Sequence, residues 1–166
     1  MRDFYGVLEN LPTRAVCPAI LAAPLAGTIV PLTEVNDAIF AGKMLGDGIA
    51  IEPSDGRLFA PCSGIVTSVF HTGHAVSIRS DDGCKILLHI GIDTVKSGGR
   101  FFRTAAKAGD RVHKGDLLVR FDIHGLRSAG CHLTAPMIIC NTVDYAAVTA
   151  VASGSISAGE NLLSLK

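Results

Sequence analysis

Short apolar runs separated by glycine and turn residues recur along the whole chain of 166 residues, and they limit the possible fold more than any other feature. The run HAVSIRS at 74–80 alternates between apolar and polar residues, which is typical of a β-strand. The 18 glycines suit the tight turns between such strands. The pattern predicts an all-β fold, an antiparallel β-sandwich or barrel with short flanking helices.

Two pairs of similar segments indicate an internal duplication. APLAGTIV at 23–30 is similar to APCSGIVT at 60–67, and GDRVHKGDLLV at 109–119 is similar to SGSISAGENLL at 153–163. Each motif reads as strand, turn, strand, and the spacing is not that of a solenoid repeat. We expect duplicated hairpin motifs whose two halves face each other. The alternative is a chance likeness between glycine-rich hairpins.

Helical signals are few. The sequence predicts short helices at 36–44, 100–109 and 122–130, with either Asn36 or Asp37 as the N-cap of the first. The remainder of the chain is expected to be strand and turn.

Charge and composition exclude several classes of protein. Fifteen basic residues balance fifteen acidic ones, so we expect no nucleic-acid partner. The apolar stretch at 16–30 is too short to span a bilayer, and the first residues lack the basic start of a signal peptide. The five cysteines form no CxxC pair, which favours reduced thiols. We expect a cytoplasmic protein with a flexible N-terminal segment, 1–20, and one domain, 21–166.

One predicted hairpin carries a histidine in each strand, His74 and His89. If Asp81 and Asp82 form a two-residue loop, the two histidines face each other directly. If the loop is Asp82-Gly83, they are diagonal neighbours on one face, and only a loop of odd length would separate them onto opposite faces. Directly opposed Cβ atoms lie about 5 Å apart, so we expect the two imidazoles to meet.

Three interpretations of this histidine pair remain open from the residues alone. The first is a structural pair that is stacked or hydrogen-bonded. The second is half of a zinc site, since His89 is followed four residues later by Asp93. The third is phosphoryl transfer, because a neutral imidazole nitrogen is a good nucleophile near pH 7. In that case the Thr72 hydroxyl could orient the His74 ring.

Several segments at matching spacing resemble the glucose-type IIA domain of the bacterial phosphoenolpyruvate:sugar phosphotransferase system. They are GDGIAIEPSDG, APCSGIVTSVFHTGHAVSI, LLHIGIDTV and GDRVHKGDLLVRFD, in that order. The resemblance extends from about Ala22 to the C-terminus and implies an antiparallel β-sandwich. The sequence departs from the family pattern at VKSGGRFF, so we expect that loop to differ in shape.

The resemblance implies a role for each residue of the pair. The outer nitrogen of His89 would accept a phosphoryl group from phospho-HPr, His74 would support it, and Thr72 would orient His74. The group would then pass to a cysteine on the IIB domain of a sugar permease during carbohydrate uptake. This chemistry requires no cofactor.

The resemblance also implies a docking surface around the histidines, with acidic side chains beside the site at Asp37 and Asp93. Asp37 could also serve as a helix cap. The apolar candidates for this surface are Ile39, Phe40, Phe70, Val76, Leu87 and Val95.

The alternative functions either use the same residues or require motifs that the sequence lacks. A regulator would bind metabolic enzymes or transporters through this surface, with a zinc ion at His74 and His89 completed by a partner's carboxylate. A zinc peptidase of related fold needs an additional H-x-H pair, and the sequence has none. A biotinyl or lipoyl carrier needs a modified lysine in a characteristic motif, and GKML around Lys43 does not match it.

Overall fold

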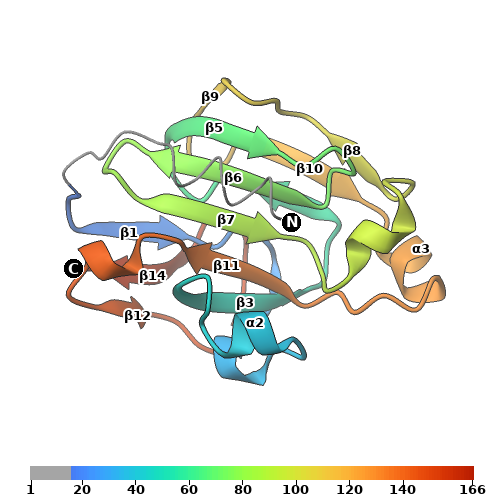
Figure 1. Cartoon of the computed structure of the whole chain (residues 1–166), viewed down its shortest axis with the longest axis horizontal. Coiled ribbons are helices and arrows are strands. Elements are labelled where there is room, and N and C mark those ends of the chain that lie inside the picture. Colours follow the sequence, from blue (N-terminus) through green and yellow to red (C-terminus); the bar gives the residue numbers. More distant parts are fainter. Residues whose placement is uncertain (1–15) are drawn as a thin grey trace.

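The computed structural model describes residues 16–166, and most of the regular structure in this part of the chain is antiparallel β-sheet (Figure 1). The strands are β1 Ala19–Ala22, β2 Gly27–Pro31, β3 Asp47–Pro53, β4 Arg57–Phe59, β5 Gly64–Val69, β6 Ala75–Ser80, β7 Lys85–His89, β8 Phe102–Thr104, β9 Arg111–Val112, β10 Leu117–Phe121, β11 Ala135–Ile139, β12 Val148–Ala150, β13 Ser155–Ile156 and β14 Asn161–Leu165. The helices are α2 Ala38–Ala41 and α3 Ile123–Ser128, with 3-10 turns η1 Leu32–Glu34, η2 Thr94–Ser97 and η3 Thr142–Asp144.

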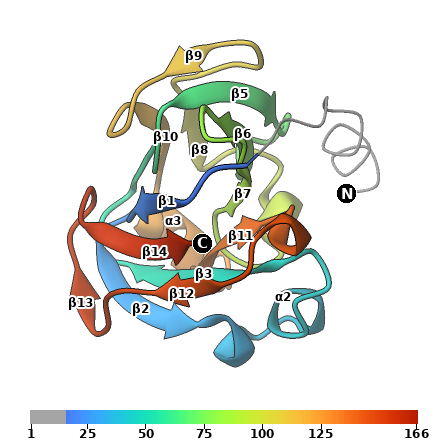
Figure 2. The same cartoon turned by 90° about the vertical axis from the view of Figure 1, so that its left-hand side faces the viewer.

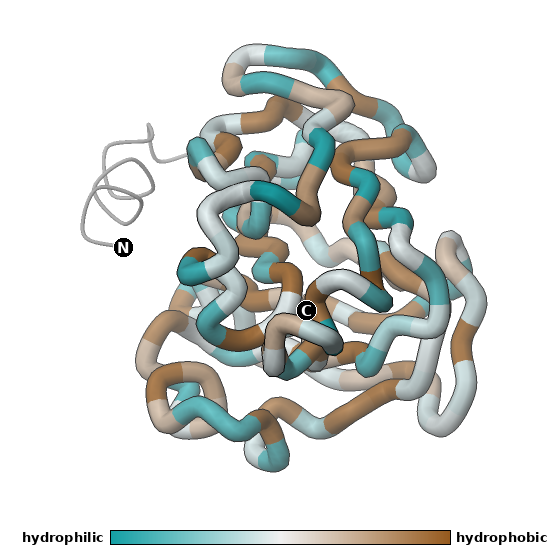
Figure 3. Tube along the Cα trace, turned by 90° about the vertical axis from the view of Figure 1, so that its right-hand side faces the viewer, coloured by the Kyte–Doolittle hydropathy of each residue, from teal (hydrophilic) through white to brown (hydrophobic). Residues whose placement is uncertain are grey.

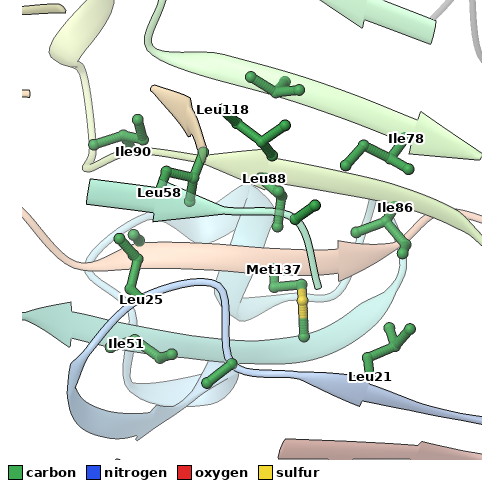
Figure 4. Close-up of a cluster of buried hydrophobic side chains, with 14 of the residues drawn as sticks. Leu21, Leu25, Ile51, Leu58, Ile78, Ile86, Leu88, Ile90, Leu118 and Met137 are labelled. Atoms are coloured by element: carbon green, nitrogen blue, oxygen red, sulfur yellow. The ribbon is translucent and has the colours of Figure 1, made fainter. Parts of the chain in front are cut away.

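Three sheets pack around one interior (Figures 1 and 2). The largest has the strand order β13-β2-β3-β11-β7-β6-β5-β9, and the two smaller ones are β1-β14-β12 and β4-β10-β8. Each sheet contributes to the same buried cluster, as Ile78, Leu118 and Leu21 show in Figure 4. Hydrophobic and hydrophilic residues alternate at short intervals along the chain (Figure 3). The all-β prediction is confirmed.

A second buried cluster covers the opposite face of the largest sheet. It contains Phe40 from α2, Leu32 from η1 and Leu87 from β7. The central strands of this sheet are therefore buried on both faces. This explains why their sequences are nearly continuous apolar runs.

The predicted duplication appears in the strand pairing. β2 pairs with β13, where Gly27 faces Ile156, and β5 pairs with β9, where Gly64 faces Val112. These are the residues that the two sequence matches aligned with each other. The adjoining turns repeat the same backbone bonds, Ala23 N–H to Glu160 O at 2.7 Å and Ala60 N–H to Asp116 O at 2.8 Å.

Two of the three predicted helices are present in shortened form. α2 is one turn long, and Asp37 caps it by accepting hydrogen bonds from the backbone N–H groups of Ile39 and Phe40. α3 begins after Asp122, whose carboxylate accepts from the Gly125 N–H.

The prediction of a helix at 100–109 is wrong, because strand β8 lies there. Phe102 in β8 faces Phe121 in β10, and both side chains are buried. Pairing with a strand further along the chain overrides the local helical preference of the segment.

The loop between β6 and β7 has three residues, Asp81, Asp82 and Gly83, so both predicted two-residue loops are wrong. Ser80 N–H donates to Cys84 O at 2.8 Å, and Gly83 has a φ of 90°. A three-residue hairpin loop needs such a left-handed residue at its end, which glycine adopts without strain. The register therefore places Ala75, and not His74, opposite His89.

The predicted N-terminal segment, 1–20, lies mostly outside the described residues. Within the described part, Ala19 and Ile20 already belong to β1 and pair with β14. No helix in the described part of the chain is long and apolar enough to cross a membrane.

Candidate functional site

His74 and His89 meet at the ends of their strands. Their ring centroids lie 4.9 Å apart, with the planes 79° from parallel. His74 is the residue before β6 and follows Gly73, whose φ is 78°, so the regular alternation of β6 does not extend to it. The prediction that the imidazoles meet is confirmed. The prediction that an odd loop would separate them is wrong, because His74 is not part of the regular strand.

One nitrogen of the His89 ring is held by the backbone. Nδ1 lies 2.7 Å from Gly91 O. A carbonyl oxygen only accepts hydrogen bonds, so in the neutral ring the proton is on Nδ1 and donates to Gly91 O. The lone pair of Nε2 is then available as a nucleophile or as a metal ligand.

Gly91 suits this role because a side chain does not fit there. Its φ is 73°, and a Cβ on it would lie 2.5 Å from His132 O and 2.6 Å from Thr94 Cγ2. The Thr94 hydroxyl donates to Ile90 O at 2.5 Å and stabilises the same turn. Gly91 was not among the predicted site residues, since it acts through its backbone carbonyl. The one hint in the sequence was that a glycine stands two residues after His89.

The His74 ring is fixed from several sides. Its Nδ1 forms a hydrogen bond with Thr72 Oγ1, and both residues are buried. The Phe70 ring packs edge-on at 4.7 Å between centroids, and the Phe102 ring lies at 6.4 Å. The predicted contact of Thr72 with His74 is therefore present. Phe102 is a further neighbour that sequence reasoning missed, because it lies in the segment predicted as a helix.

Burial keeps both imidazoles neutral at pH 7. Burial, with smaller contributions from the nearby His89 and His71, lowers the pKa of His74 from 6.5 to about 3. Burial also lowers the pKa of His89, against the opposite effects of the hydrogen bond to Gly91 and the charges of Asp37 and Asp93. A neutral imidazole is the form that a nucleophilic nitrogen requires.

We expect neither ring to titrate near neutral pH in the folded protein. The NMR resonances of His74 and His89 should stay constant as the pH falls through 6.5, the ordinary value. The unfolded chain in urea serves as the control, since its histidines take up protons near that pH. A folded-state midpoint near 6.5 for either ring would show that burial does not hold it neutral.

The same shifts predict how stability depends on pH. Below pH 6.5 the unfolded state binds more protons than the folded state, because the folded pKa values are lowered. The free energy of unfolding is therefore unaffected by these two rings above pH 6.5 and falls as the pH decreases below it, by up to about 1.4 kcal/mol per pH unit for His74.

Five of the predicted docking residues are exposed or half-buried. Ile39 is 42% exposed and Val95 is 38% exposed. Asp93 is exposed and lies 3.9 Å from Lys96 Nζ, while Asp37 is half-buried. The charges of Asp37 and Asp93 act on His89, and Ile39 and Val95 follow them by two residues along the chain, so an acidic and apolar rim borders the histidines. Phe70 is also half-buried, with its ring against His74.

The other three predicted docking residues are buried and cannot contact a partner directly in this structure. Val76 and Leu87 are 0% and 1% exposed, because the two faces of the largest sheet are both covered. Phe40 is 2% exposed, and its ring packs against His89 at 5.1 Å between centroids. Phe40 therefore supports His89 from within, which corrects its predicted place on the surface.

Comparisons with known proteins bear on what such a pair does. Residues 19–145 match a family described as phosphoenolpyruvate-dependent sugar phosphotransferase system, EIIA 1. The glucose-specific EIIA component of Oceanobacillus iheyensis is 40% identical over 96% of this chain and 94% of its own length. The β-glucoside-specific EIIBCA component of Dickeya chrysanthemi is 42% identical over 95% of this chain, and the chain spans only 27% of that relative.

A solved structure supports the fold. The glucose permease IIA from Mycoplasma capricolum superposes with a TM-score of 0.85 and 35% sequence identity, over 90% of this chain and 97% of that one. The strands of the present chain are therefore arranged as in that protein, which agrees with the predicted β-sandwich.

Proposed function

The chain belongs to the EIIA 1 family of the phosphoenolpyruvate-dependent sugar phosphotransferase system, and we propose that it carries a phosphoryl group on His89 during sugar uptake. The observation that supports this most is the arrangement of the His89 ring. One nitrogen is engaged by Gly91 O and the other is left with its lone pair beside a second imidazole. A structural pair has no need for a free lone pair in an apolar setting.

In the accepting step, the lone pair of His89 Nε2 attacks the phosphorus of phospho-HPr. A nitrogen–phosphorus bond forms on His89, and the bond to the HPr histidine breaks with its electron pair returning to that nitrogen. In the second step, a cysteine thiolate of a IIB domain attacks the phosphorus, and the electron pair returns to His89 Nε2. No nucleotide, metal or cofactor takes part in either step.

His74 acts as a hydrogen-bond donor to the phosphoryl oxygens. When the Thr72 hydroxyl donates to Nδ1 of His74, the ring proton is on Nε2, on the side of the ring away from Thr72. Because the ring is packed between Phe70 and Phe102, it is already oriented before the phosphoryl group arrives. A donor that needs no reorganisation stabilises the developing negative charge most effectively.

The accessible rim of Ile39, Val95, Asp37 and Asp93 is the proposed docking surface for both partners. Its two carboxylates suit a basic side chain next to the phosphohistidine of HPr. The fused EIIBCA relatives support a IIB domain as the second partner. Regulated enzymes or transporters that bind according to the phosphorylation state would use the same rim.

Zinc binding by the histidine pair is a second candidate property. Neutral imidazoles are common zinc ligands, and two of them supply half of the usual four. In residues 16–166 no group of three histidine, cysteine, aspartate or glutamate side chains is placed to hold a metal ion. The described residues therefore fit a zinc ion only in part, and its other ligands would come from a partner chain.

The direct test is to incubate the chain with phosphoenolpyruvate, enzyme I and HPr and to follow its mass. We expect a gain of one phosphoryl group that acid removes, since phosphorus bound to a histidine nitrogen is labile in acid. The reaction without HPr is the control and should give no gain. An unchanged mass, with enzyme I and HPr shown to be active on each other, would contradict the carrier function.

A further inference from the structure

Three arginines form a row across the small sheet β4-β10-β8. Arg120 in β10 faces Arg103 in β8 on one side and Arg57 in β4 on the other. On the opposite face, the neighbouring pair Phe121 and Phe102 is buried, with ring centroids 6.5 Å apart. The arginines therefore share the outer face, and all three are exposed.

The row is only partly neutralised within the described part of the chain. Arg57 forms an ion pair with Asp55 at 2.7 Å. Arg103 and Arg120 form no ion pair or side-chain hydrogen bond with any residue of 16–166. Like charges that face each other directly across a sheet are destabilising, so this arrangement lowers the stability of the folded chain. A bound anion would offset this repulsion.

A pocket of about 310 Å³ lies over these two unpaired arginines. Arg100 also lines it and lies with its guanidinium over the Phe101 ring, 4.4 Å from the centroid. The one acidic side chain that lines the pocket is Asp122, and its carboxylate already accepts a hydrogen bond from the Gly125 N–H. Three guanidinium groups and a single carboxylate thus border one hollow, so its lining in the described part of the chain carries a net positive charge.

From this arrangement we infer that Arg100, Arg103 and Arg120 bind a phosphate group, carried by a small phosphorylated metabolite or by a lipid headgroup. Guanidinium groups present paired N–H donors that match two oxygens of a phosphate, and a dianion offsets the repulsion between two facing arginines. The volume falls within the range of ligand pockets, and it suits a small molecule or headgroup. The balanced charge of the chain argues against a long nucleic acid.

The site is separate from the histidine pair. Phe102, the buried neighbour of Arg103 in β8, lies 6.4 Å from the His74 ring on the inner side of the sheet. The arginines point to the other side. Phosphate binding here therefore does not depend on the carrier function, and either of them can fail while the other holds.

The test compares the unaltered chain with Arg120→Gln and with the control Arg111→Gln, an exposed arginine of β9 that pairs with Asp81. Each protein is titrated with inorganic phosphate and with glucose 6-phosphate while the amide NMR signals are followed. Each is also mixed with vesicles of phosphatidylcholine, with and without phosphatidylglycerol. Thermal unfolding of each variant checks the fold, and Arg120→Gln should unfold at a higher temperature because it removes the repulsion.

We expect the amide signals of Arg103 and Arg120 in the unaltered chain to shift and then saturate as ligand is added. Arg120→Gln should weaken the binding affinity at least tenfold, and Arg111→Gln should leave it unchanged. Binding of the small phosphates would identify a metabolite as the source. Binding to phosphatidylglycerol vesicles alone, lost in Arg120→Gln and reduced by salt, would identify a lipid headgroup. The inference is overturned if neither ligand binds, or if Arg120→Gln and Arg111→Gln bind like the unaltered chain.

Discussion

Replacement of His89 with alanine is expected to abolish phosphorylation by phospho-HPr. The variant lacks the nucleophile, because the contact of Nδ1 with Gly91 O leaves the lone pair of His89 Nε2 free in the unaltered ring. Removal of a nucleophile lowers the rate of such a reaction by about 10³-fold or more. The measurement is incorporation of label from phosphoenolpyruvate through enzyme I and HPr, analysed over a range of times.

Two further variants make this result specific. His124→Ala removes an exposed histidine of α3 and should be labelled at the unaltered rate. His89→Gln keeps a polar side chain beside Phe40 and should also remain unlabelled. Thermal unfolding of each variant shows whether the sheet is intact. Normal labelling of a folded His89→Ala protein would refute the assignment of the phosphoryl acceptor.

Replacement of His74 with alanine is expected to leave acceptance of the phosphoryl group measurable and to slow its transfer to a IIB domain. His74 supplies a preorganised donor next to the phosphoryl oxygens, and loss of such a group lowers a rate by about 10²-fold or more. The two steps are separated by isolating the phosphorylated variant and following a single turnover with a IIB domain.

A matched variant separates this role from packing. Thr72→Val keeps the His74 ring between Phe70 and Phe102 but removes the hydroxyl that orients it. We expect its transfer rate to lie between those of the unaltered protein and His74→Ala, with little change in thermal unfolding. Transfer to the IIB domain at the unaltered rate in both variants would contradict the supporting role of His74.

The sequence predicted the parts of the fold that local patterns encode. Gly27 and Gly64 begin equivalent strands, as their sequence match predicted, and they pair at Ile156 and Val112, the two positions that the second match aligned. The short helices that follow Asp37 and Asp122 were also predicted, because an N-cap acts on the residues directly after it. Strand β8 was missed because it is stabilised by β10, and no local pattern reports that partner.

The site, too, was predicted only where local sequence patterns determine it. The meeting of His74 and His89 was predicted, but the loop length was not, because SDDG fits loops of two or three residues. Val76 and Leu87 were placed on the surface because periodicity does not show that both faces of a strand are covered. The acceptor at Gly91 is a backbone carbonyl, which every residue carries, so its role became visible only in the structure.

The most direct test of the account is to determine which nitrogen carries the phosphoryl group. The phosphorylated chain, labelled with ¹⁵N, can be studied by NMR correlations between the ring protons and the ring nitrogens. Because Nδ1 of His89 is engaged by Gly91 O, we predict a single phosphohistidine, modified at Nε2 of His89. Phosphorylation at Nδ1, or on any other residue, would contradict the proposed geometry of transfer.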